Sequence, residues 1–145
     1  MSSFVPIPSS SIGCKFFMGI TGLLLIGFVL GHMTGNLLIF MGPEAINEYG
    51  EFLQTMGHGV LIWVARIGLV AIFSIHMTLA FVLRKKNNSA RPVPYGADGT
   101  IQASWASRHM MLTGIVIFLF LVYHIAHFTV GAIDPDNHKE VIARD

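Results

Sequence analysis

The chain has 145 residues, of which 53% are hydrophobic and 12% are charged, and its formal net charge is +1. Soluble domains carry about 25% charged residues, so this composition excludes an ordinary soluble domain. The small net charge gives no reason to expect nucleic acid as a partner. A single cysteine, Cys14, excludes an intrachain disulfide and a cysteine metal cluster. We interpret Cys14 as a small buried apolar residue.

Three segments are long and apolar enough to cross a bilayer, which takes about 20 residues of helix. They cover residues 16–41, 60–83 and 110–133, and none contains more than one fixed charge. The first segment is too long for the apolar core of a secretory signal, so we interpret it as a helix of the mature protein. The sequence therefore predicts an all-α integral membrane bundle, with three transmembrane helices in one domain covering 1–145.

The links between the three spans differ in character. The middle of the 42–59 link, from Glu44 to Met56, is compatible with a short amphipathic helix on the membrane surface. The 84–109 link contains a polar run and two prolines, which predict an irregular loop. It also holds five Lys and Arg residues, whereas the 42–59 link has none. Because cytoplasmic loops are enriched in Lys and Arg, we expect the N-terminus and the 84–109 link to face the cytoplasm.

Histidines lie inside all three predicted spans, at positions 32, 76, 124 and 127. Ionisable side chains in a bilayer are costly, rare and commonly functional. An unpaired neutral imidazole leaves one donor and one acceptor without partners. A hydrogen bond across helices to Ser, Thr or backbone is the alternative explanation for any one of them. Histidines in all three spans favour a shared function.

The depth of each histidine follows from the helix rise of about 1.5 Å per residue. His32 lies 16 residues beyond the inner end of the first span, or about 24 Å up. His124 lies 14 residues beyond the inner end of the third span, or about 21 Å up. His76 is 7 residues from the inner end of the descending second span, or only about 10 Å up. His32 and His124 therefore share a level, and His76 lies deeper.

Two histidines at one level on facing helices can bind the iron of one haem from both sides. We predict that His32 and His124 form such a pair, and that His76 belongs to a second haem site whose partner ligand is not evident in this chain. His127 is either an alternative ligand or, as we favour, a contact to a propionate or quinone. Three residues are expected to share a face with His124: Thr113, Ile117 and Gly131.

Two further features lie near these histidines. Gly27, Gly31 and Gly35 recur every four residues beside His32, which allows close approach of a porphyrin ring and, equally, of another helix. Arg66 is the only fixed charge well inside a span. A buried cation needs an anion, and a haem propionate would serve. The alternative is that the Arg66 side chain extends to the membrane surface.

Short motifs follow one another in a fixed order along nearly the whole chain. They are Ser11-Ile12-Gly13-Cys14-Lys15, Thr21-Gly22, Gly31-His32-Met33-Thr34-Gly35-Asn36-Leu37, Asn47-Glu48-Tyr49, Ile75-His76-Met77, Ala90-Arg91-Pro92 with Tyr95, Ser107-Arg108-His109-Met110, Thr113-Gly114 and Tyr123-His124. In this order they resemble the b558-type cytochrome b subunits that anchor succinate dehydrogenase and fumarate reductase in the membrane.

The resemblance implies an anchor of five helices with two haems b, each held by two histidines from different helices. By resemblance, His32 and His124 match the ligands of the outer haem, and His76 matches one ligand of the inner haem. A flavoprotein and an iron–sulfur subunit are the implied partners on the cytoplasmic face of a bacterial inner membrane, and electrons pass between them and a quinone. No soluble catalytic site is visible, so the chain is not expected to be a free-standing enzyme, and the resemblance implies that it is a subunit of an oxidoreductase complex.

This sequence stops after the third helix, whereas the family has two more, one of which carries the fourth haem ligand. We therefore expect the chain to be C-terminally incomplete relative to the family, as a fragment or shortened product, or to receive the missing helices from another subunit. Two other functions remain open. One is a haem-free anchor that frames a quinone pocket. The other is a small histidine-based proton or metal transporter, which the lack of intramembrane carboxylates disfavours.

Overall fold

The computed structural model describes residues 10–90 and 103–136, and within these ranges all the regular structure is helical. Three helical stretches are long and apolar enough to cross a membrane: Ser11–Met41, Val60–Ala90 and Met110–Thr129. The chain is therefore an all-α membrane protein with three spanning helices, as the sequence predicted. It forms two compact units, Met1–Pro94 and Tyr95–Asp145.

The first span begins at a capped helix terminus. Helix α1 covers Ser11–Asn36, and the Ser10 hydroxyl at its N-cap accepts a 2.9 Å hydrogen bond from the backbone N–H of Gly13. Such a cap satisfies one of the otherwise unpaired N–H groups of the first turn. The 3₁₀ helix η2 (Leu37–Met41) continues the span and ends at Gly42. Gly42 has φ 112° and ψ 166°, a backbone conformation that is essentially restricted to glycine.

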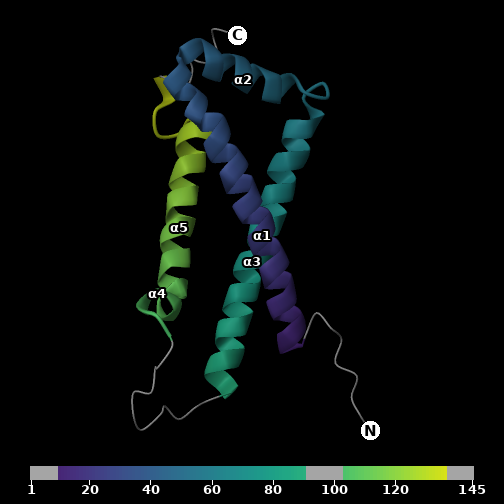
Figure 1. The fold of residues 1–145 in the computed structure, drawn as a ribbon, viewed down its shortest axis with the longest axis vertical. Coiled ribbons are helices and arrows are strands. Elements are labelled where there is room, and N and C mark those ends of the chain that lie inside the picture. Colours follow the sequence, from purple (N-terminus) through teal and green to yellow (C-terminus); the bar gives the residue numbers. More distant parts are fainter. Residues whose placement is uncertain (1–9, 91–102, 137–145) are drawn as a thin grey trace. The chain divides into compact units, whose positions relative to one another are not determined.

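The predicted amphipathic helix in the first link is present as α2 (Pro43–Thr55). Pro43 occupies the first turn, where a missing N–H costs nothing. In Figure 1, α2 lies across one end of the helical hairpin formed by α1 and α3 (Val60–Ala90), the end at which α1 finishes and α3 begins. We call this end the α2 end of the first unit. The opposite end, where α1 starts and α3 finishes, we call the basic end.

The turn between α2 and α3 holds three consecutive residues in the left-handed region. Gly57, His58 and Gly59 have φ values of 62°, 56° and 78°. For an L-residue with a Cβ, the left-handed conformation costs roughly 1–2 kcal/mol. His58 is the one non-glycine residue with positive φ in the described part of the chain. The turn therefore carries a local strain at a single side chain.

We expect this strain to appear as opposite effects of two substitutions at one position. His58→Gly removes the Cβ and should leave stability unchanged or raise it by up to about 1 kcal/mol. His58→Val introduces a β-branched side chain that tolerates positive φ poorly and should lower stability by about 1 kcal/mol or more. Thermal unfolding in detergent, followed by circular dichroism, measures both. Equal melting temperatures for the two variants would contradict the strain.

Helix α3 covers Val60–Ala90 and is seven residues longer than the span expected to end at Leu83. The prediction of an irregular loop from residue 84 onward was therefore wrong for its first part. Arg and Lys are good helix formers, and the added turns pack against α1: the Lys86 Nζ lies 3.8 Å from the Sγ of Cys14. Cys14 is only 2% exposed, which confirms that it is buried. Residues 91–102, with both prolines of the loop, lie outside the described residues.

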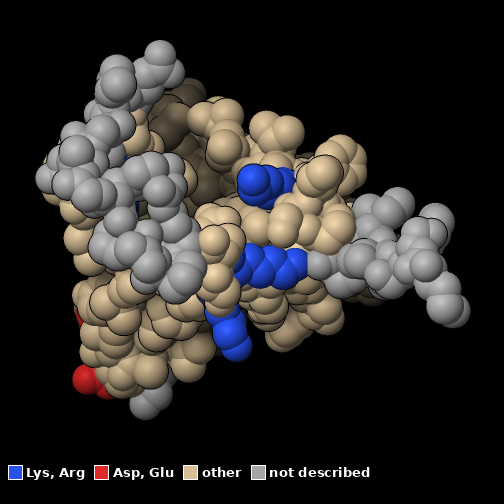
Figure 2. Space-filling view, turned by 90° about the horizontal axis from the view of Figure 1, so that it is seen from below, with Lys and Arg blue, Asp and Glu red and all other residues tan. Residues whose placement is uncertain are grey.

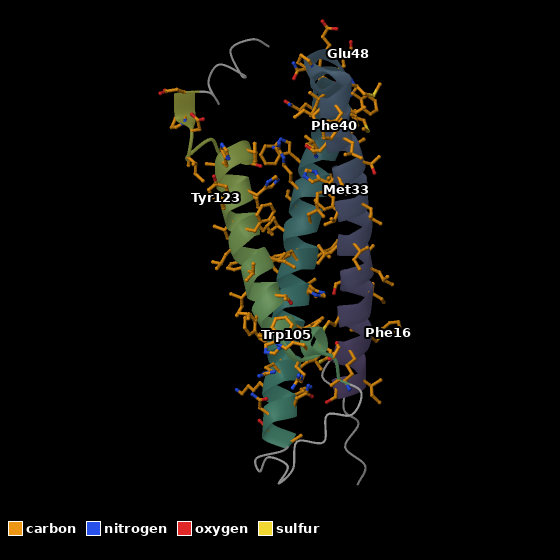
Figure 3. All side chains as sticks on the ribbon, turned by 60° about the vertical axis from the view of Figure 1, so that its left-hand side comes forward. Phe16, Met33, Phe40, Glu48, Trp105 and Tyr123 are labelled. Carbon is orange, nitrogen blue, oxygen red and sulfur yellow. The ribbon has the colours of Figure 1, made fainter. Side chains whose placement is uncertain are left out.

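Basic and acidic residues lie at opposite ends of the first unit. Figure 2 looks from below, onto the end at which α3 finishes, and shows Lys and Arg side chains gathered there. Lys85 and Lys86 line an open groove at this basic end together with Ser11 and Ser89. Helix α2, at the other end, carries three acidic and no basic residues. Glu48 is labelled there in Figure 3.

The α1–α3 pair has a very small interior. Within the described residues, the buried side chains are Cys14, Leu83 and Thr21. Large apolar side chains along both helices are exposed instead; for example Leu23, Ile67 and Val70 are each 60% exposed or more. A surface this apolar is unstable in water, so it must face lipid or other protein.

The second unit contains a short helix, a span and a π turn. Helix α4 covers Trp105–Arg108, α5 covers Met110–His124, and the π-helical turn η3 covers Ile125–Thr129. The span was expected to reach residue 133, and it ends four residues earlier. Gly131 has φ 68°, and Ala132 donates 2.9 Å to the carbonyl of Ala126, which is a glycine-based helix stop.

Candidate functional site

His76 is the histidine whose surroundings the first unit defines most fully. Its Nδ1 lies 3.0 Å from the Oγ1 of Thr21 on α1. A Cβ placed on Gly22 would stand 3.3 Å from His76 Cε1 and 3.9 Å from Nδ1. The Nδ1–Cε1 edge of the imidazole therefore faces α1, and the absence of a side chain at Gly22 lets it approach. Sequence reasoning missed this contact.

The same contact fixes the level of His76 relative to His32. Thr21 marks the position on α1 that faces His76. His32 lies eleven residues farther along α1, which corresponds to about 16 Å of helix. The two imidazoles therefore belong to different levels of the α1–α3 pair, and the first unit does not bring them together.

His32 lies near the end of the regular part of α1. Its ring stacks on Phe28, one turn earlier, with centroids 5.3 Å apart and an interplanar angle of 20°. Asn36, one turn later, donates through Nδ2 to the His32 carbonyl at 2.7 Å and lies 3.4 Å from the ring Nε2. Figure 3 labels the neighbouring Met33, which lies well along α1 from Phe16. The imidazole thus has an apolar ring on one side and a polar amide on the other.

Of the three glycines beside His32, Gly35 has a side chain of another helix packed on it, whereas no described side chain packs on Gly27 or Gly31. A Cβ on Gly35 would stand 2.5 Å from Cε1 and 2.8 Å from the Oη of Tyr49, so the tyrosine ring of α2 lies directly on this glycine. At Gly27 and Gly31, no described atom lies within 4 Å of such a Cβ. Packing of α2 therefore explains why residue 35 is a glycine. Helix packing within the first unit does not explain why residues 27 and 31 are glycines.

His124 is the last residue of α5, at the junction with the π turn η3. Its ring stacks on Phe120, one turn earlier, at 5.6 Å and 28°, and lies 5.1 Å from the ring of Phe128 at 53°. Tyr123, labelled in Figure 3, lies far along α5 from Trp105. π turns are rare and occur frequently at functional sites. The position of His124 beside one is therefore a second reason, besides its imidazole, to consider it a functional residue.

His127 lies inside the π turn, and its ring stacks on Phe128 at 4.3 Å and 28°. Tyr123 meets it edge-on at 5.7 Å. Of the residues expected to share a face with His124, Gly131 does not, because the helix has ended before it. The assignment of Gly131 to that face was wrong for this reason.

The guanidinium of Arg66 lies 5.0 Å from the ring centroid of Trp63, as a cation–π pair. Both side chains are exposed. Trp63 is three residues closer to the α2 end of α3 than Arg66, so the charge is turned toward that end. This direction suits extension to the membrane surface. A cation over an aromatic ring also remains available to an anion on its other side.

The described side chains of these helices offer imidazoles, rather than a cluster of acidic or thiol groups, as ligands for a metal or haem. Among the described residues, no three His, Cys, Asp or Glu side chains form a group able to hold a metal ion. Haem iron takes four ligands from its porphyrin and only two from the protein, and neutral imidazole is a common one. The imidazoles of His32, His76 and His124 and the open positions at Gly27 and Gly31 fit that requirement. His32 and His124 belong to different units, and their pairing remains a prediction.

Comparisons of the chain with protein-family models, with curated protein sequences and with solved structures found no match.

Proposed function

We propose that the chain is a haem b-containing membrane anchor of a succinate:quinone oxidoreductase, either a succinate dehydrogenase or a fumarate reductase. His32 and His124 are the ligands of one haem, and His76 is a ligand of a second. A haem supplies a one-electron carrier when bound. In this proposal the chain's own residues hold imidazole nitrogens at two levels of the membrane, and Arg66 and His127 bind propionate or quinone oxygens.

The observation that supports this proposal most directly is the presence of an imidazole in each of three membrane-spanning helices. His76 lies about 16 Å from the level of His32, so these two serve separate carriers. Phe28 and Phe120 stack on His32 and His124 in the same way, one turn before each. The ordered motifs that resemble the b558-type subunits support the specific complex.

Orientation and partners follow from the separation of charge. In this proposal the basic end of the first unit faces the bacterial cytoplasm, because Lys and Arg are retained on that side, and the acidic helix α2 faces outward. The last turns of α3, which carry Arg84, Lys85 and Lys86, then extend past the bilayer toward the iron–sulfur and flavoprotein subunits. Electrons move between those subunits and a membrane quinone through the two haem levels.

The proposal predicts a b-type optical signal from the intact complex. The full chain is purified in mild detergent with its co-expressed subunits, and a reduced-minus-oxidised spectrum is recorded beside a haem-to-chain ratio. We expect a b-type spectrum at one haem per chain or more. A folded chain in an intact complex without this signal would exclude the haem function.

A second candidate is a haem-free anchor, and the His76–Thr21 hydrogen bond is the observation that favours it. A polar contact between two transmembrane helices stabilises them by about 0.6–2 kcal/mol, and His76 needs no other role if that is its purpose. In this case His76→Ala lowers the melting temperature of the chain and leaves its optical spectrum unchanged.

A further inference from the structure

The hydroxyl of Thr21 is the polar group that contacts His76, and three polar atoms lie within hydrogen-bond distance of it. Thr21 Oγ1 lies 2.8 Å from the carbonyl oxygen of Phe17 and 3.1 Å from that of Met18, in addition to 3.0 Å from His76 Nδ1. Thr21 is only 7% exposed, so water does not compete for these bonds. A hydroxyl has one hydrogen to donate and lone pairs with which to accept.

Two arrangements of hydrogens satisfy these distances, and they differ in the imidazole tautomer. If Thr21 donates to the Phe17 carbonyl, its oxygen accepts from the Nδ1–H of His76, and the Nε2 of the ring carries a lone pair. If Thr21 donates to Nδ1 instead, the ring carries its hydrogen on Nε2. His76 Nε2 has no hydrogen-bond partner among the described residues. Both arrangements leave Nε2 without a partner among the described residues, but only the first leaves it with a lone pair that can bind iron.

The first arrangement also leaves Nε2 accessible. The described residues contain no side-chain nitrogen or oxygen that is both buried and without a partner. Since Nε2 has no partner, it is not enclosed by the protein. The Nδ1–Cε1 edge faces α1 at Thr21 and Gly22, so the nitrogen with the free lone pair lies at the accessible part of the ring.

We propose that Thr21 is the positioning residue of the inner haem ligand: its hydroxyl accepts the Nδ1–H of His76, fixes that tautomer, and leaves Nε2 to bind iron. The inference rests on the proposed haem function and adds to it a residue on a different helix. Partners of this kind orient a metal-binding histidine and raise its basicity as a ligand. A more basic ligand stabilises ferric over ferrous iron and so lowers the reduction potential.

The test compares Thr21→Val, which keeps the shape of the side chain and removes the hydroxyl, with Thr21→Ser, which keeps the hydroxyl. Both are measured in the intact complex by potentiometric titration of the haem spectrum. In Thr21→Val, the component that depends on His76 should rise in potential, and its haem affinity should fall by roughly 10- to 100-fold. Thr21→Ser should retain the wild-type potential. The outer component should be unchanged in both, which reports that the chain is folded.

The outcomes separate the inference from the proposed function. A wild-type complex without haem overturns both. Two haem components in the wild type, with equal inner potentials in Thr21→Val and Thr21→Ser, overturn the role of Thr21 alone. If Thr21→Val fails to fold and loses both components, nitrogen-15 NMR of the reduced, diamagnetic wild-type complex decides. A His76 Nδ1–H resonance shifted downfield by a hydrogen bond supports the assignment to Thr21, the described side chain within reach of this nitrogen, and an Nδ1–H at the position of an unbonded imidazole N–H refutes it.

Discussion

Replacing His32 or His124 by alanine should remove the same haem, completely in each case, and replacing His76 should spare it. A haem bound by two axial imidazoles loses half of its protein coordination when either is deleted, and alanine supplies no donor. His76 is separated from the level of His32 by about 16 Å of helix, so under the proposed function we expect it to bind the other component. The measurement is a redox-resolved difference spectrum of the purified complex, with haem content determined chemically.

A matched control is His109→Ala, because that histidine stacks on Trp105 at 4.3 Å and lies at the cap of α5, outside the span. It should leave both components in place. The pairing by depth fails if His32→Ala and His76→Ala deplete the same component while His124→Ala depletes another. It also fails if His124→Ala leaves every component intact in a folded chain.

The second large effect is expected at Gly35. A methyl group there would meet the Tyr49 ring at 2.5–2.8 Å, which is closer than real Cβ contacts, so the ring must leave its position on α1. Since this ring attaches α2 to α1, we expect Gly35→Ala to lower the unfolding free energy by about 1–3 kcal/mol, as overpacking does elsewhere. Thermal unfolding in detergent, followed by Tyr and Trp fluorescence, measures the loss.

Gly19→Ala on the same helix is the matched control, because no described atom lies within 4 Å of its added Cβ. There the lower backbone entropy of alanine should stabilise the helix by about 0.5–1 kcal/mol. A double-mutant cycle with Tyr49→Ala isolates the cause, since the cost of Gly35→Ala should vanish once the ring is gone. An unchanged cost in that background would place the effect somewhere other than the Tyr49 contact.

The spans were predictable from sequence because the bilayer restricts the choice of structure. Without water to bind the backbone, an apolar stretch of this length has to be helical, and the hydropathy pattern located all three spans. The ends were harder to predict. Hydropathy falls after Leu83, but Arg84 to Ala90 remain helical because packing against Cys14 supports them. In contrast, the apolar residues continue past Gly131, so hydropathy predicted a longer span, although this glycine stops the helix.

The candidate site was predictable as residue types and depths, and less so as contacts. That His76 needs a partner followed from the cost of an imidazole in lipid. Thr21 was identifiable in principle, because it lies five residues from the inner end of its span and His76 lies seven from its own. The direction of each side chain around its helix decides such a contact, and the sequence alone does not supply how the two helices are rotated against each other. The stacking of Phe28 on His32 was not predicted either, because a four-residue spacing is common on helices and does not by itself indicate a ring contact.

Helix α2 also acts as a spacer. Its 13 residues make a rod about 20 Å long, and it joins the α2 ends of two helices that hold each other elsewhere, through Cys14–Lys86 and Thr21–His76. The two helices cross in Figure 1, and α2 lies across the end at which α1 finishes and α3 begins. We therefore expect the separation of α1 and α3 at the α2 end to follow the length of α2. Removing one turn of α2 would shorten it by about 5 Å and leave the α1–α3 contacts near the basic end unchanged.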